Sequence, residues 1–194
     1  MNTSLSNDNT LVFAIINSDM LQIINTIQHG FNWPSEPSHH LDFIKNVKLP
    51  IQKGGKELST GVFYYLCDND NKLIFTSNLS DGWNSLLYCI SRQNKSNYLL
   101  FRIHQGEPPL MEMSFVEAGN TVRLIRVMKE SKWEFYEIGA PLWFEQKEHY
   151  SHRKISDRVT YELLLSYSIK NGVDFTSPNF FRTQKESLWM NEIR

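Results

Sequence analysis

The chain lacks the charge and cysteine patterns that would assign it to several large classes of protein. Its 20 basic and 21 acidic residues give a formal net charge of −1, without the basic excess that is typical of nucleic-acid binders. The same balance does not support electrostatic attachment to an anionic membrane. Two cysteines are too few for a disulfide framework. We therefore expect neither a nucleic-acid partner nor a membrane partner.

Long apolar segments and targeting signals are also missing. The longest apolar run, at residues 11–16, is far too short to span a bilayer. Residues 1–10 are polar, carry a charged side chain at Asp8, and have neither the basic region nor the long apolar run of a signal peptide. We therefore expect a cytoplasmic protein.

No recognised catalytic or cofactor motif is present in the sequence. There is no G-x-S-x-G segment, and no G-x-G-x-x-G segment follows a predicted strand. The glycine-rich residues 52–56 precede a predicted strand rather than a helix, so they do not match a phosphate-binding loop. We expect a protein that is not an enzyme and that holds no cofactor.

Histidines form two groups of candidate metal ligands. His149 and His152 are three residues apart, so a helix would place them on one side, and His39 and His40 lie just before Asp42. Neither group has the spacing of a recognised zinc site, and hydrogen-bonded loop histidines account for both. We expect no bound metal, although either pair remains open as a ligand group.

Two kinds of hydrophobic pattern fill the middle of the chain. Alternating segments between turn residues predict six strands, at residues 60–67, 72–76, 98–104, 110–117, 122–128 and 133–138. Apolar residues at helical spacing predict helices at residues 19–29, 81–91 and 157–171, the last one capped by Ser156. Residues 11–16 fit a buried strand or the lead-in to the first helix.

The order of these elements predicts one α+β domain over residues 1–194. We expect a mainly antiparallel sheet of about six strands, with helices packed on one face. Residues 31–58 contain Pro34, Pro37 and Pro50 and are expected to be a long irregular connection. Residues 173–194 form a C-terminal tail, whose large apolar side chains predict that it packs on the body.

The last two predicted strands specify a hairpin. With residues 129–131 as the loop, Ile125 lies opposite Phe135 and Arg123 lies opposite Glu137. Each aromatic–aliphatic or opposite-charge pair of this kind contributes roughly 0.2–1 kcal/mol. A slip by one residue would place charged residues against aromatic ones, so the pattern favours this pairing.

Large aromatic residues in predicted loops are the candidate binding residues. Trp, Tyr and Arg are the usual anchors of protein interfaces, and a core-only account leaves these aromatics without a place. The alternative is that they cover the ends of the sheet. The candidate partner-binding set consists of the aromatics Trp33, Trp143, Phe144 and Tyr150 and the flanking acids Glu145 and Glu148.

Several segments within residues 80–172 carry a resemblance. They are Ser80-Asp-Gly-Trp83-x-x-Leu86-Leu87, then Lys132-Trp133-Glu-Phe-Tyr-Glu-Ile-Gly139-x-Pro-Leu-x-Phe-Glu145, then Tyr150 and Ser156-Asp-Arg158. Together they resemble small cytoplasmic α+β proteins of bacteria, among them immunity proteins of polymorphic or contact-dependent toxin systems. The resemblance implies a non-catalytic inhibitor that covers a toxin domain. Immunity proteins against nucleases are often strongly acidic, so this near-neutral chain does not favour a nuclease target.

Two other functions compete with toxin binding. An enzyme of unrecognised family would have a cleft between the sheet and residues 31–58, in which His39, His104 and Glu112 would have to converge. A phage-encoded or accessory ligand-binding domain is the third alternative. An apolar pocket with converging titratable groups would favour the enzyme, and an aromatic-rimmed surface would favour a binding protein. A homo-oligomer is compatible with each of them.

Overall fold

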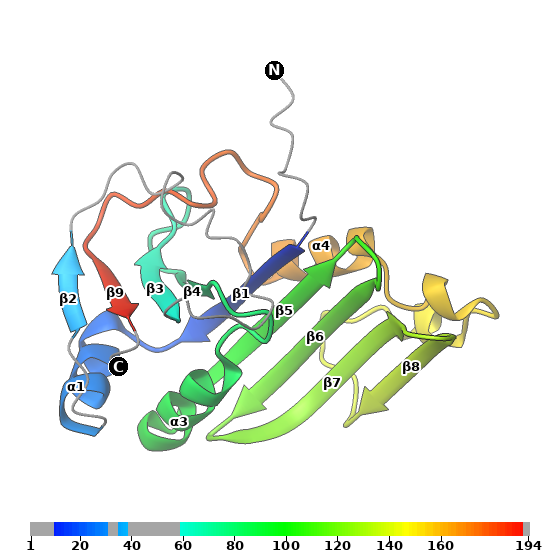
Figure 1. The fold of residues 1–194 in the computed structure, drawn as a ribbon, viewed down its shortest axis with the longest axis horizontal. Coiled ribbons are helices and arrows are strands. Elements are labelled where there is room, and N and C mark those ends of the chain that lie inside the picture. Colours follow the sequence, from blue (N-terminus) through cyan, green and yellow to red (C-terminus); the bar gives the residue numbers. More distant parts are fainter. Residues whose placement is uncertain (1–9, 31–34, 39–58, 192–194) are drawn as a thin grey trace.

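The computed structural model describes residues 10–30, 35–38 and 59–191. One antiparallel sheet of nine strands runs through it in the order β2-β9-β3-β4-β1-β5-β6-β7-β8 (Figure 1). The strands are β1 (Thr10–Asn17), β2 (Ser35–Ser38), β3 (Thr60–Tyr65), β4 (Leu73–Ser77), β5 (Asn97–His104), β6 (Leu110–Glu117), β7 (Asn120–Lys129), β8 (Trp133–Ile138) and β9 (Ser187–Asn191). The predicted α+β class with an antiparallel sheet is confirmed, but about six strands was too few.

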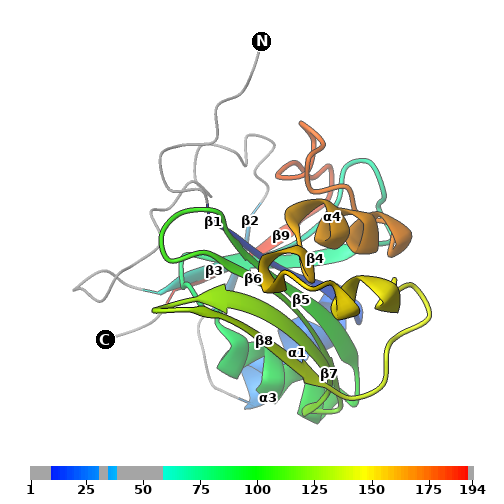
Figure 2. The same ribbon diagram turned by 90° about the vertical axis from the view of Figure 1, so that its right-hand side faces the viewer.

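Helices cover both faces of this sheet, so the prediction that they pack on one face was wrong. The described helices are α1 (Met20–Gly30), α3 (Asn84–Asn94) and α4 (Tyr161–Lys170), with the 3-10 turns η1 (Lys147–Ser151) and η2 (Ile155–Asp157). Figure 2 shows α4 on one side of the sheet and α1 with α3 on the other. Two hydrophobic cores result, one under α4 and one under α1 and α3.

Strand β1 explains why two cores form. It lies between β4 and β5, and its successive side chains point to opposite faces. Phe13 and Ile15 enter the core under α4, while Val12 and Ala14 enter the core under α1 and α3. A strand that is buried on both faces has a continuous apolar sequence, which is why residues 11–16 do not alternate.

Two strands fall in segments where none was predicted. Strand β2 lies within the expected irregular connection and pairs with β9 at one edge of the sheet. Pro37 of β2 has no N–H to donate, which suits an edge strand and hides it from a strand search. Strand β9 lies in the C-terminal tail and pairs with β3, so the tail contributes backbone as well as side chains to the sheet.

The expected starts of two helices were also wrong. Helix α4 begins after Thr160, whose side-chain hydroxyl accepts a hydrogen bond from the Leu163 N–H, rather than after Ser156. Helix α3 begins after Trp83, which has a left-handed backbone with φ 54° and a buried ring. Trp83 and Leu87 are both buried, as predicted for a helix that packs on the sheet.

The hairpin of β7 and β8 differs from the predicted register by two residues. Ile125 lies opposite Glu137 rather than Phe135, and the loop is formed by residues 130–132. A shift of two residues keeps each side chain on its predicted face. Glu137 still forms an ion pair with Arg123, at 2.9 Å, although the two are not direct cross-strand partners.

Tertiary contacts at the end of β8 account for this register. Gly139 has φ +76°, and a Cβ built on it would lie 1.9 Å from the Val122 carbonyl oxygen. The Nη1 group of Arg123 donates hydrogen bonds to the carbonyl oxygens of Ile138 and Gly139, at 3.2 and 2.7 Å. These backbone contacts favour the observed register over the predicted one, whose cross-strand pairs would contribute roughly 0.2–1 kcal/mol each.

Within the described residues, no helix has both the length and the apolar character that crossing a membrane requires. The longest α-helices there, α1 and α3, contain 11 residues each.

Replacing Gly139 tests the account of the register. Gly139→Ala should lower the free energy of unfolding by about 2 kcal/mol or more, because it combines a left-handed backbone with a clash against main chain. At roughly 2–4 °C per kcal/mol for a chain of this size, thermal unfolding should begin clearly earlier.

Gly106→Ala is the matched control for this change. The added methyl would meet only the imidazole of His104, the nearest atom being 2.9 Å away, and that side chain can move. Its unfolding free energy should stay within about 1 kcal/mol of the parent. Equal stability of the two variants would show that Gly139 does not determine the register.

Candidate functional site

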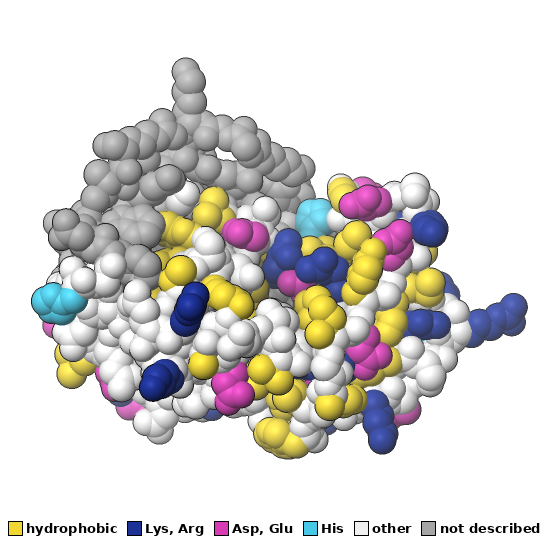
Figure 3. All heavy atoms as spheres, turned by 90° about the horizontal axis from the view of Figure 1, so that it is seen from below, with side chains coloured by type: hydrophobic (Ala, Val, Ile, Leu, Met, Phe, Trp, Pro, Cys, Tyr) yellow, Lys and Arg dark blue, Asp and Glu magenta, His cyan; other side chains and the backbone are white. Residues whose placement is uncertain are grey.

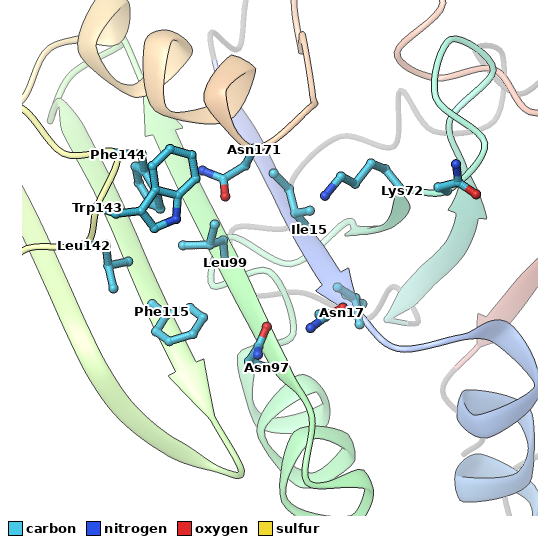
Figure 4. Close-up of a pocket in the computed structure, with 12 residues that line it drawn as sticks. Ile15, Asn17, Lys72, Asn97, Leu99, Phe115, Leu142, Trp143, Phe144 and Asn171 are labelled. Carbon is cyan, nitrogen blue, oxygen red and sulfur yellow. The ribbon is translucent and has the colours of Figure 1, made fainter.

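A groove of about 320 Å³ opens on the α4 side of the sheet, where β1 ends and β5 begins (Figure 4). Segments far apart in the sequence meet there. Its lining consists of Ile15, Ile16, Asn17, Asn71, Lys72, Asn97, Leu99, Phe115, Leu142, Trp143, Phe144 and Asn171. This volume is at the lower end of the range for small-molecule sites and can hold a few side chains of a partner.

The floor of the groove is apolar. Ile15, Leu99 and Phe115 come from the neighbouring strands β1, β5 and β6, and they project from the face that α4 covers. Their floor extends the core under α4 outward, so a ligand group placed on it would contact hydrophobic side chains. Burying such a group there is favourable in proportion to the apolar area that leaves water.

Trp143 forms one wall of the groove and is the most exposed large hydrophobic residue among those described. Its side chain is 81% exposed, and its ring meets the Phe144 ring edge-on at 5.5 Å. Phe144 is itself buried and packs at 5.5 Å against Tyr167 of α4. The indole therefore stands in solvent on a buried aromatic base (Figure 4).

A buried ion pair holds this wall in place. Arg123 of β7 and Glu145 each have 0% side-chain exposure, and Nη2 of Arg123 lies 2.7 Å from Oε2 of Glu145. Nε of Arg123 donates to the same carboxylate at 2.9 Å. Glu145 also accepts a hydrogen bond from the Leu142 N–H at 2.9 Å, so the pair fixes the backbone just before Trp143.

Two tyrosines complete this cluster, hereafter the Arg123 cluster (Arg123, Glu137, Glu145, Tyr150 and Tyr167). The Tyr150 hydroxyl donates to Glu145 at 2.6 Å and lies 3.0 Å from the Tyr167 hydroxyl. Burial raises the pKa of Tyr150, and its hydrogen bond to Glu145 raises the pKa further. Burial alone would lower the pKa of Arg123, but its hydrogen bonds to Glu145 and Glu137 raise it overall. The guanidinium of Arg123 therefore stays charged and the Tyr150 hydroxyl stays neutral at neutral pH.

The opposite wall of the groove is polar. Lys72 extends from the turn before β4 toward Ile15, and Asn17, Asn97 and Asn171 lie around the apolar floor (Figure 4). Asn17 and Asn97 are cross-strand partners at the ends of β1 and β5. This wall thus presents one ammonium group and several carboxamides next to hydrophobic surface.

The structure separates the predicted partner-binding residues into two groups. Trp143 and Glu148 are exposed, whereas Phe144, Tyr150 and the Glu145 side chain are buried. The expectation of surface positions was therefore wrong for those three, because they form the base of the Trp143 wall. Trp33 lies outside the described residues. No sequence signal marked Lys72 or the asparagines, which are brought together only by the fold.

The histidine pairs are placed differently from each other. His149 and His152 lie in and after η1 with ring centroids 4.9 Å apart, and Nδ1 of His152 lies 3.2 Å from the Asp157 carbonyl oxygen. No group of three or more His, Cys, Asp or Glu side chains converges within the described residues. His39 and His40 lie outside them, so the absence of a metal stays a prediction.

The residues expected for an enzyme do not converge in the described part of the chain. His104 and Glu112 lie on neighbouring strands, but Glu112 is engaged by both Arg102 and Arg126. Nδ1 of His104 lies 2.5 Å from the Thr10 hydroxyl. His39 lies outside the described residues. Both described groups are thus occupied by neighbours.

Comparison of the chain with protein-family models, with curated proteins and with solved structures finds no match. The residues of the groove and its walls are therefore the basis for inferring a function.

Removing one member of the buried ion pair tests the Arg123 cluster. Arg123→Met should lower the free energy of unfolding by about 3–5 kcal/mol, because it leaves the Glu145 carboxylate buried without its partner. Lys154→Met is the control: Lys154 pairs with Asp157 at 3.1 Å with both side chains well exposed, so its loss should cost at most about 1 kcal/mol. Urea unfolding of both variants makes the comparison, and similar losses would contradict the account.

Alkaline pH should destabilise the fold. Burial raises the pKa of Tyr64, Tyr98, Tyr150 and Tyr167 above the ordinary value near 10. Above that pH the unfolded chain loses these protons while the folded chain keeps them, so stability should fall by about 1.4 kcal/mol per pH unit for each tyrosine. Below pH 9 this contribution should be constant.

Replacing single tyrosines with phenylalanine shows which of them cause the loss of stability at alkaline pH. Tyr150→Phe should flatten the fall in unfolding free energy above pH 10 more than Tyr136→Phe, because the Tyr136 hydroxyl is exposed and the pKa of this tyrosine is raised chiefly by its hydrogen bond to Glu134. An unfolding free energy that is constant up to pH 11 would show that these hydroxyls ionise freely in the folded protein.

Proposed function

We propose that this chain is a bacterial immunity protein that acts in the cytoplasm by binding a cognate toxin domain and neutralising it through protein–protein contact. The observation that carries the proposal is the indole of Trp143, which is 81% exposed and stands on buried Phe144, which in turn packs on Tyr167 of the Arg123 cluster. Tryptophan is among the residues most enriched in interface hot spots. A fixed support lowers the entropy lost when such a side chain is buried by a partner.

The chemistry of the groove favours binding over catalysis. Lys72 is the one ionisable side chain among its lining residues. General acid–base catalysis needs groups matched to giving and taking a proton, usually a pair in unequal surroundings. Carboxamides and hydrophobic side chains, which make up most of this lining, recognise a ligand without reacting with it.

The face of the molecule that Figure 3 shows is compatible with a protein partner. On it, Lys and Arg side chains are interspersed with Asp and Glu side chains and with hydrophobic ones. This face therefore shows no single-signed stripe of the kind that attracts nucleic acid. Glu148 is exposed and can steer a basic region of the toxin, while Glu145 is neutralised by Arg123.

A ligand-binding accessory domain is the second candidate, and the groove itself favours it. Its apolar floor and its ring of carboxamides can take a small molecule as well as a protein side chain. The two functions differ in the size of what is bound, so a titration with the neighbouring gene product separates them.

Truncation of Trp143 tests the proposal. In a complex with the proposed toxin, sought first as the product of the neighbouring gene, Trp143→Ala should weaken binding by about 2 kcal/mol or more, roughly thirtyfold, while the thermal unfolding temperature stays unchanged. Leu21→Ala is the matched control, because Leu21 is 72% exposed on α1 at the other face of the sheet. It should bind the toxin as the parent does.

Isothermal titration of the purified pair provides the measurement. No binding of the neighbouring protein below roughly micromolar concentration, about −8 kcal/mol, would rule out the immunity function. Tight binding with equal affinities for the parent and Trp143→Ala would keep the function but would exclude this surface.

A further inference from the structure

We propose that the groove is an anion-selective subsite, which takes a carboxylate of the partner protein together with an adjoining apolar side chain. The proposal deepens the proposed function and depends on it for the identity of the partner. It says which charge the bound group carries, which the position of Trp143 alone does not determine.

Lys72 has no carboxylate partner among the described residues. The acids that precede it in the turn are engaged elsewhere: Asp70 pairs with Lys185 at 3.0 Å, and Asp68 accepts hydrogen bonds from Ser177 and Asn179. An ammonium group carries three donors and no acceptor, so it recognises an anion directly. The positive charge at the groove is therefore available to a ligand.

The stem of Lys72 lies beside Gly172, at the edge of the groove. A Cβ built on Gly172, at the end of α4, would lie 3.0 Å from Cε of Lys72 and 3.0 Å from Nδ2 of Asn69. Asn69 in turn donates to the Gly172 carbonyl oxygen at 3.2 Å. The lysine stem thus passes close to the glycine backbone, where a residue with a side chain would not leave it this room.

Carboxamides add further donors on the same side. No hydrogen bond joins the side chains of Asn17, Asn71 or Asn97 to another described residue, while Nδ2 of Asn171 donates to the Tyr167 carbonyl oxygen at 2.8 Å. The first three amide groups can therefore turn their N–H donors toward an anion. Glu117 pairs with Asn97 across β5 and β6 but does not line the groove.

The apolar floor of the groove determines which type of side chain can bind next to the carboxylate. Leu99 and Phe115 lie between the polar wall and Trp143, so a ligand that reaches Lys72 also covers hydrophobic surface (Figure 4). An acidic residue beside an aromatic or aliphatic one has this combination. The occupant is therefore such a segment of the partner protein, because it matches both the charge of Lys72 and the apolar floor.

Two small probes test the subsite without the partner. N-acetyl-phenylalanine carries a carboxylate beside an aromatic ring, and N-acetyl-phenylalaninamide is its neutral counterpart. In two-dimensional NMR titrations, the carboxylate should shift the side-chain signals of Trp143, Asn17 and Asn97 with a dissociation constant of roughly 1 mM. The neutral probe should have a dissociation constant at least about fivefold higher.

Variants of two lysines assign the charge effect. Lys72→Met keeps most of the stem and should remove the preference for the carboxylate probe. Lys132→Met is the control, because Lys132 is exposed in the loop between β7 and β8, and it should bind as the parent does. Equal binding of the two probes to the parent, or an unchanged preference in Lys72→Met, would overturn the proposal.

The second part of the test measures how tightly the toxin binds the Lys72→Met variant. Lys72→Met should weaken it about tenfold, with the circular dichroism spectrum and unfolding temperature of the parent retained. A contrary outcome is that the toxin binds Lys72→Met and the parent protein with equal affinity although the parent prefers the carboxylate probe. This result would show that no carboxylate of the toxin occupies the groove. If the probes behave as expected but no neighbouring protein binds, the immunity function fails and the anion preference remains.

Discussion

The arrangement of the candidate site depends on one buried ion pair, between Arg123 and Glu145. A buried charge is costly unless its partner and its hydrogen bonds are all in place. Here the guanidinium reaches Glu145, Glu137 and the carbonyl oxygens at the end of β8, and the carboxylate also accepts from Tyr150 and from the backbone before Trp143. The pair therefore joins the edge hairpin, the following loop and α4.

The ion pair also affects how Trp143 is presented at the surface. Residues 142–145 follow an edge strand, where a loop has few constraints of its own. Glu145 and Phe144 are buried, and Glu145 holds the Leu142 N–H, so the backbone on both sides of Trp143 is anchored to the core. Trp143 thus projects from an anchored segment beside the groove that it borders. Placing recognition groups on such a fixed frame is a general route to specific binding.

The sequence predicts the parts of the fold that depend on local patterns. The alternation in β5 to β8, the helical spacing of α1 and α3, and Gly172 with φ +83° at the end of α4 all follow from such patterns. It could not predict that β9 enters the sheet, since a strand of five residues gains most of its stability from distant partners. Trp143 was a candidate from its residue type. Lys72 and Asn17 were not, because only the fold brings them together.

Hydrogen exchange of this protein with and without the product of the neighbouring gene, the candidate toxin, tests the central claim most directly, since it maps the contact surface without any substitution. Binding at the groove predicts that amide protection increases in residues 141–146 and in the turn around Lys72, while α1 and α3 on the other face exchange as before. Protection confined to α1 and α3, or no change anywhere at saturating toxin, would contradict the account.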